Sequence, residues 1–122
     1  MMQELLSVGI GSFLGGIARY GISLAMKSMS AAFPWATLTA NTAGCLLIGI
    51  ICALFNRHAH FSSHAYLFLT VGFCGGFTTF STFSKESLIL LQSGQYRAFL
   101  FYASGSVLLG ILAVMAGYAI IK

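Results

Sequence analysis

The stretch Gly72-Phe-Cys-Gly-Gly-Phe-Thr-Thr-Phe-Ser-Thr-Phe-Ser-Lys85 lies in the middle of a long apolar segment. Gly75-Gly76 is a poor helix interior, and Thr78 and Thr79 carry hydroxyls that bond backbone groups in place of helix bonds. Such a break leaves peptide groups unpaired, which a membrane tolerates only where protein or a polar cavity satisfies them. The stretch therefore predicts a helix that is broken at membrane depth.

The composition places this segment in a membrane. The chain has 122 residues, of which 58% are hydrophobic and 7% are charged, whereas a soluble domain carries roughly 25% charged residues. Aspartate is absent and the acids are Glu4 and Glu86, so paired-carboxylate catalysis and clustered-carboxylate metal sites have no material. Six widely spaced basic residues argue against a nucleic-acid surface. We expect an all-α integral membrane protein that is not an enzyme.

Four apolar segments are long enough to cross about 30 Å of hydrocarbon. They are Leu5–Met26, Trp35–Phe55, Ala65–Leu91 and Ala98–Ile121. The third is too long for one straight helix, and a break near Gly75-Gly76 divides it into two half-helices. Because the connections are short, we expect residues 1–122 to form a single domain of four transmembrane helices.

The loop charges scarcely distinguish the two sides of the membrane. The side that holds the N-terminus carries Arg57 and Lys122, and the opposite side carries Lys27 and Arg97. Two against two leaves the positive-inside rule little to act on, so we expect insertion in both orientations and an antiparallel, dual-topology homodimer. One orientation set by a subtler charge bias is the alternative. Small residues four apart would give the helices close contacts: Gly11 and Gly15, Ala40 and Gly44, and Ser106 and Gly110.

Two polar side chains inside the first and second spans need partners. Arg19 is too costly to expose to lipid, so it faces either a vestibule that attracts anions or a structural ion pair with Glu86. Asn41 donates its amide either to an anion or to the carbonyl of a neighbouring helix. From the residue alone, the second interpretation of Asn41 is favoured, because asparagine commonly joins membrane helices.

The half-helix after the break combines aromatic rings with hydroxyls. Phe80 and Phe83 share one helix face, and a ring edge is positive enough to contact a dehydrated anion. Ordinary packing is the commoner role for two phenylalanines at this spacing. The interleaved hydroxyls favour the anion interpretation, because they supply donors that a bare anion needs: Ser81, Thr82 and Ser84.

The break itself offers backbone carbonyls at the negative end of a half-helix. Carbonyls converging from two antiparallel copies, between Gly75 and Thr79, would suit a hard monovalent cation. The alternative is a kink that relieves a mismatch of hydrophobic length. The loop histidines lack thiolate or carboxylate partners and do not indicate a metal site: His58, His60 and His64.

The run Gly72–Phe83 closely resembles the signature of the Fluc (CrcB) fluoride channels, and Gly15–Tyr20 and Thr37–Gly44 match further family motifs. The resemblance covers the whole chain. It implies a dual-topology homodimer with two antiparallel fluoride pores and a central structural sodium ion.

The resemblance also implies roles for individual residues. Phe80 and Phe83 would be the pore phenylalanines, supported by Asn41. The carbonyls of Gly75 and Thr78 would bind sodium. The remaining residues are the vestibule charge Arg19, the hydroxyls near the pathway at Ser81, Thr82 and Ser84, and the candidate pore residue Ser106.

We therefore expect a multi-pass protein of a bacterial inner membrane that conducts fluoride passively out of the cytoplasm. A four-helix exporter of the small multidrug-resistance type is the main alternative. It would need an acidic residue within the first span, where this chain has Arg19. A membrane scaffold without transport is a second alternative, and it would leave the break without a role.

Overall fold

The computed structural model describes residues 1–58 and 62–121, and all regular elements in these ranges are helices. His60 and Lys122, considered above, lie outside the described residues. Four helical segments are long and apolar enough to cross a membrane. They are α1 (Met2–Ala25), α2 (Trp35–Arg57), the broken segment Ser63–Gln92 and α6 (Tyr96–Ile121). The prediction of four spans is confirmed, with each end within three residues of the expected position.

The third span is broken close to the position that the sequence predicted. Its parts are α3 (Ser63–Leu67), the π-helix η1 (Phe68–Cys74), α4 (Gly75–Phe77) and α5 (Ser81–Gln92). Gly75-Gly76 is helical, and the backbone becomes extended at Thr78, with φ −91° and ψ 162°. The helix therefore ends just after the expected Gly75-Gly76, and the extended backbone begins two residues after Gly76, at Thr78. Gly76 instead allows close packing, because a Cβ there would lie 2.9 Å from the Cα of Ser12.

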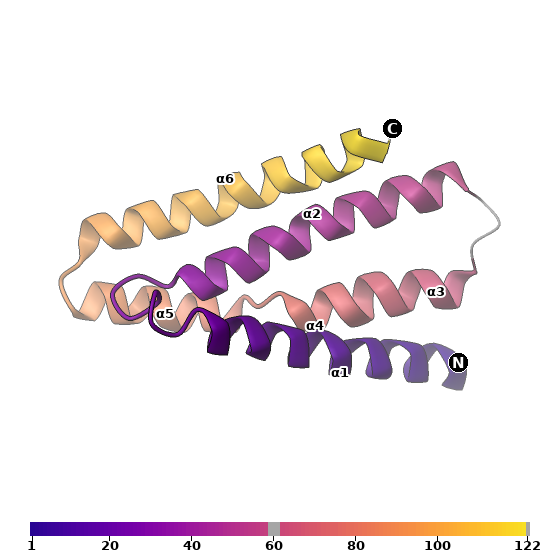
Figure 1. The fold of residues 1–122 in the computed structure, drawn as a ribbon, viewed down its shortest axis with the longest axis horizontal. Coiled ribbons are helices and arrows are strands. Elements are labelled where there is room, and N and C mark those ends of the chain that lie inside the picture. The colour runs from indigo at the N-terminus through magenta and orange to yellow at the C-terminus, as the bar shows by residue number, and fades with distance from the viewer. Residues whose placement is uncertain (59–61, 122) are drawn as a thin grey trace.

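The helices associate in two groups, seen in Figure 1. Helix α1 runs beside η1 and α4, while α2 runs beside α6. After the break, α5 packs against α6 and so links the two groups. Both ends of the chain lie at the same end of the bundle, as four crossings require (Figure 1). The break consequently lies part-way along the bundle, between α2 and α6 on one side and α1 on the other.

Glycines bring the helix backbones into direct contact. A Cβ on Gly15 would lie 2.8 Å from the backbone nitrogen of Phe77, and one on Gly11 would lie 2.9 Å from that of Phe73. The predicted small-residue face of the first span is thus confirmed. Gly117 of α6 approaches the α2 backbone in the same way, a contact that the Ser-xxx-Gly pattern of that helix did not indicate.

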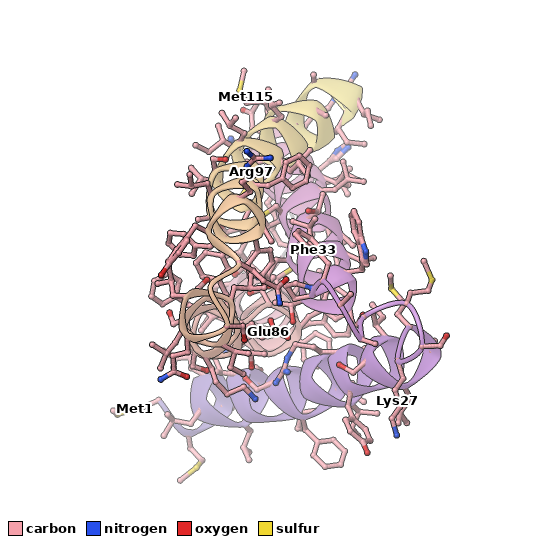
Figure 2. All side chains as sticks on the ribbon, turned by 90° about the vertical axis from the view of Figure 1, so that its left-hand side faces the viewer. Met1, Lys27, Phe33, Glu86, Arg97 and Met115 are labelled. Carbon is pink, nitrogen blue, oxygen red and sulfur yellow. The ribbon has the colours of Figure 1, made fainter. Side chains whose placement is uncertain are left out.

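The tightest side-chain packing lies at the end of the bundle away from the termini. The Tyr102 side chain is 0% exposed and contacts Leu38 and Leu90. The ring of Phe33 meets that of Tyr102 edge-on, with centroids 5.5 Å apart. Figure 2 views this end and shows Phe33 and Glu86 toward its centre, with Lys27 at the periphery. A single copy therefore closes this end with its own aromatic side chains.

The outer faces of α1 and α6 remain apolar and exposed. On α1 they present Phe13 and Ile17, and on α6 Leu108 and Ile111, each more than half exposed. Such faces need lipid or another protein surface to cover them. Together with the four apolar helices, they make this chain a multi-pass membrane protein.

Candidate functional site

A cavity of about 390 Å³ lies at the break, between α2, the break itself and α6. Its walls are Asn41, Cys45, Gly75, Thr78, Thr79, Phe80, Phe83, Ser106, Val107 and Gly110. The structure therefore brings together residues that the sequence analysis had singled out in three different spans. Four other predicted site residues are not among those that line this cavity. They are Arg19 of α1 and the hydroxyl residues of α5, Ser81, Thr82 and Ser84.

The two phenylalanines lie side by side at the start of α5. Their ring centroids are 5.8 Å apart, with the planes inclined by 39°. Phe83 also contacts the ring of Tyr102 at 4.9 Å, whereas Phe80 is 79% exposed. Within one copy, the Phe80 side chain therefore makes few packing contacts, although it lies in the middle of a span. The rings meet as their spacing predicts, while their role at an ion path stays a prediction.

Asn41 holds the break in place through both ends of its amide. Its Nδ2 donates to the carbonyl of Thr79 at 3.0 Å, and its Oδ1 accepts from the Thr79 N–H at 2.8 Å. The side chain thus replaces the helical hydrogen bonds of the residue that follows the extended Thr78. Of the two interpretations of Asn41, donation to a neighbouring carbonyl is the one that the structure contains. The sequence predicts that the hydroxyls of Thr78 and Thr79 bond backbone groups. Both do, with the Cys74 carbonyl and the Thr82 N–H respectively, but the sequence does not indicate that Asn41 bonds the Thr79 backbone.

Ser106 lines the same cavity, and its hydroxyl has no hydrogen-bond partner in the described part of the chain. Its Oγ is buried, and no other atom within residues 1–58 and 62–121 bonds to it. The hydroxyl of Ser81, by contrast, lies 3.4 Å from that of Thr79. Buried hydroxyls without a partner are uncommon in proteins, and Ser87 Oγ of α5 is a second one among the described residues.

Arg19 does not form the ion pair with Glu86 that the sequence left open. Its Nε donates to the carbonyl of Gly76 at 3.4 Å, and Glu86 Oε1 accepts from the Tyr102 hydroxyl at 2.9 Å. Within the described part of the chain, the salt bridge is that of the N-terminal amine with Glu4. The reason is packing, because α1 lies against α4 and carries Arg19 to the break rather than to α5.

The two carbonyls expected to bind sodium have lost their helical donors. In a continuous α-helix the Gly75 carbonyl would accept from the N–H of Thr79, which here donates to Asn41 Oδ1. The Thr78 carbonyl would accept from the N–H of Thr82, which donates to Thr79 Oγ1 at 3.1 Å. A second cavity of about 170 Å³ is also lined by Gly75 and Thr78. Gly75 and Thr78 therefore line two cavities.

Comparison with known proteins agrees with this arrangement. The family model described as CrcB-like protein, Camphor Resistance (CrcB), matches residues 6–118. The chain belongs to the CrcB-like family. Its match spans all four helices and the break.

CrcB-like relatives of known name are similar along almost their whole length. A protein of Phocaeicola vulgatus is 47% identical over 117 residues, covering 95% of this chain and 96% of its own. One from Bacteroides fragilis is 47% identical over 120 residues, covering 95% and 94%. One from Thermus thermophilus is 45% identical over 118 residues, covering 96% and 94%. Each of these relatives is named fluoride-specific ion channel FluC.

Proposed function

We propose that this chain forms a passive, fluoride-selective channel that lets fluoride leave the cytoplasm across a bacterial inner membrane. One observation carries the proposal: Ser106, whose buried hydroxyl is unpaired, and the two phenylalanines line one mid-span cavity. Relatives covering almost the whole chain are named as fluoride channels. The cavity and the names of the relatives both favour transport over catalysis.

The chemistry of this cavity suits a small dehydrated anion. Fluoride must exchange its water shell for donors along the path, which a hydroxyl and positive ring edges provide. An interior-negative membrane potential favours anion exit by about 2.3 kcal/mol per 100 mV, so no coupling ion is required. Proton-coupled export of the multidrug-resistance type would need a carboxylate well inside the first span, where this chain has Arg19, whereas Glu4 lies in the first turn of α1.

The channel we propose is an antiparallel homodimer with two pores. Two features support it: the near-equal loop charges on the two sides, and the 79% exposure of Phe80 in mid-span. A second copy related by a two-fold axis in the membrane plane would cover this ring. The exposed polar break would then face protein instead of lipid.

A structural sodium ion at the two-fold axis completes the proposal. Carbonyl oxygens suit a hard monovalent cation, and those of Gly75 and Thr78 are without their helical donors. These two residues would hold the ion, which when bound supplies a positive charge between the subunits. Side chains of Asn41, Thr79 and Arg19 bond the backbone on both sides of the break, at Thr79, Thr82 and Gly76.

The test is selective ion efflux from proteoliposomes that carry the purified protein. Vesicles loaded with fluoride or with chloride are diluted, and ion-selective electrodes follow the release of each anion. We expect fast fluoride efflux and negligible chloride efflux, with Ser106→Ala slowing the fluoride signal. Ser104→Ala is the matched control, because Ser104 lies on the same helix, is exposed and bonds to the Leu100 carbonyl. Fast chloride efflux, or no fluoride efflux, would refute the function.

A further inference from the structure

Two side chains at the break take backbone donors away from two carbonyls. Asn41 Oδ1 accepts the Thr79 N–H at 2.8 Å, and Thr79 Oγ1 accepts the Thr82 N–H at 3.1 Å. Each of these N–H groups stands four residues after a carbonyl, that of Gly75 in the first case and that of Thr78 in the second. Without the two acceptors, helical hydrogen bonds would close over both carbonyls.

Two neighbouring carbonyls, by contrast, do receive hydrogen bonds from side chains. Those of Gly76 and Thr79 each accept a side-chain donor, from Arg19 at 3.4 Å and from Asn41 at 3.0 Å. Side chains thus satisfy two carbonyls of the break and at the same time free two others. The freed pair, Gly75 and Thr78, lines both cavities, together with Cys45 of α2. This division is more specific than a kink requires, because a kink needs only that the helix be interrupted.

We propose that Asn41 and Thr79 are positioning residues for a cation: they capture the two N–H groups that would otherwise occupy the Gly75 and Thr78 carbonyls. This inference rests on the sodium ion of the proposed function. A carbonyl oxygen with no protein donor keeps its full lone-pair density for a hard cation. Neither side chain touches the ion. Asn41 therefore serves the cation as well as the cavity that contains Phe80.

The inference predicts different effects for substitutions at two threonines, Thr79 at the break and Thr39 on α2. The Thr79 hydroxyl is the acceptor that frees a carbonyl, whereas Thr39 faces an apolar groove on the other side of α2. Thr79→Val keeps the shape and removes the acceptor, so the Thr82 N–H returns to the Thr78 carbonyl. Thr79→Ser keeps the acceptor. Thr39→Val is the matched control.

The experiment measures cation binding by thermal stability, independently of transport. Wild-type and variant dimers in detergent are melted over a range of NaCl concentrations, with N-methylglucamine chloride keeping ionic strength constant. A ligand that binds the folded state raises the melting temperature as its concentration passes its dissociation constant. We expect Thr79→Val and Asn41→Ala each to raise the half-effective Na⁺ concentration about tenfold or more, the usual effect of losing a group that orients metal ligands. Thr79→Ser and Thr39→Val should stay within about twofold of wild type.

The outcomes separate the inference from the function on which it rests. If sodium stabilises the wild type and the half-effective concentration is unchanged in Thr79→Val and Asn41→Ala, the positioning role of these two residues is refuted, while the proposed sodium site is retained. If sodium stabilises nothing, both the cation and its positioning are refuted, and fluoride efflux still decides the channel. Because the two variants act on different carbonyls, failure of one to fold leaves the other as a complete test.

Discussion

Replacing Gly15 by alanine should separate α1 from the broken span. A Cβ at this position would lie 2.8 Å from the Phe77 nitrogen and closer still to the Phe73 carbonyl oxygen. Ordinary contact begins at 3.4 Å, so the two backbones must move apart by at least about 0.6 Å. Both obstacles are main-chain atoms and cannot rotate away. Overpacking of this kind destabilises a protein by about 1–3 kcal/mol.

Gly16 provides the control, because it is the next residue of the same helix and a Cβ there meets nothing within 4 Å. Both substitutions share the helix-propensity gain of roughly 0.8–1 kcal/mol, which cancels when the two variants are compared. We therefore expect Gly15→Ala to be less stable than Gly16→Ala by about 1–3 kcal/mol.

The comparison is measurable by unfolding in mixed detergent micelles with increasing SDS. The single tryptophan, Trp35, reports the transition by fluorescence from the start of α2. Fluoride efflux should fall in Gly15→Ala as well, because α1 positions Arg19 against the Gly76 carbonyl. Equal stability of the two variants would show that α1 does not pack on the break as described.

Three further outcomes are expected. Phe80→Ile and Phe83→Ile should slow fluoride efflux about tenfold or more, if the ring edge contributes about 1.4 kcal/mol; wild-type efflux in both would make the rings packing residues. Fluoride currents in planar bilayers should reverse at the fluoride equilibrium potential under any sodium gradient, and a reversal potential that follows sodium would indicate cotransport. Lysines added beside Ser28 or beside Ser62 should fix opposite orientations, so each variant alone should lose fluoride resistance in a sensitive host and the pair should regain it; full resistance from one variant would contradict the antiparallel dimer.

The helices were predictable because their signals are local. Runs of apolar residues about twenty long define the spans whatever they pack against. The turn at Gly94, which joins α5 to α6 with φ +75°, was equally visible in Ser93-Gly94-Gln95. The sequence also indicated that Gly11 and Gly15 lie at a contact, since small residues four apart permit one.

The exact position of the break was not predictable, because it depends on a partner far away in the chain. Local propensity placed it at the weakest helix residues, Gly75-Gly76. In the folded chain these residues keep helical geometry against α1, and Asn41 of α2 bonds the Thr79 N–H directly after the extended residue Thr78. The partner of Glu86 was missed for the same reason. Propensity describes a residue and its neighbours, whereas Asn41 and Thr79 are 38 positions apart.

The hydrogen bonds at the break have a consequence for the order of assembly. Those made by Asn41, Arg19 and Thr79 all join parts of one chain. Leaving these peptide groups unpaired in lipid until a second copy arrives would cost several kcal/mol for each group. Each copy therefore forms these hydrogen bonds while it is still alone, and leaves the Gly75 and Thr78 carbonyls to the proposed ion. The proposed dimer would then form by docking two finished bodies, at a rate set by encounter in the plane of the membrane and not by folding.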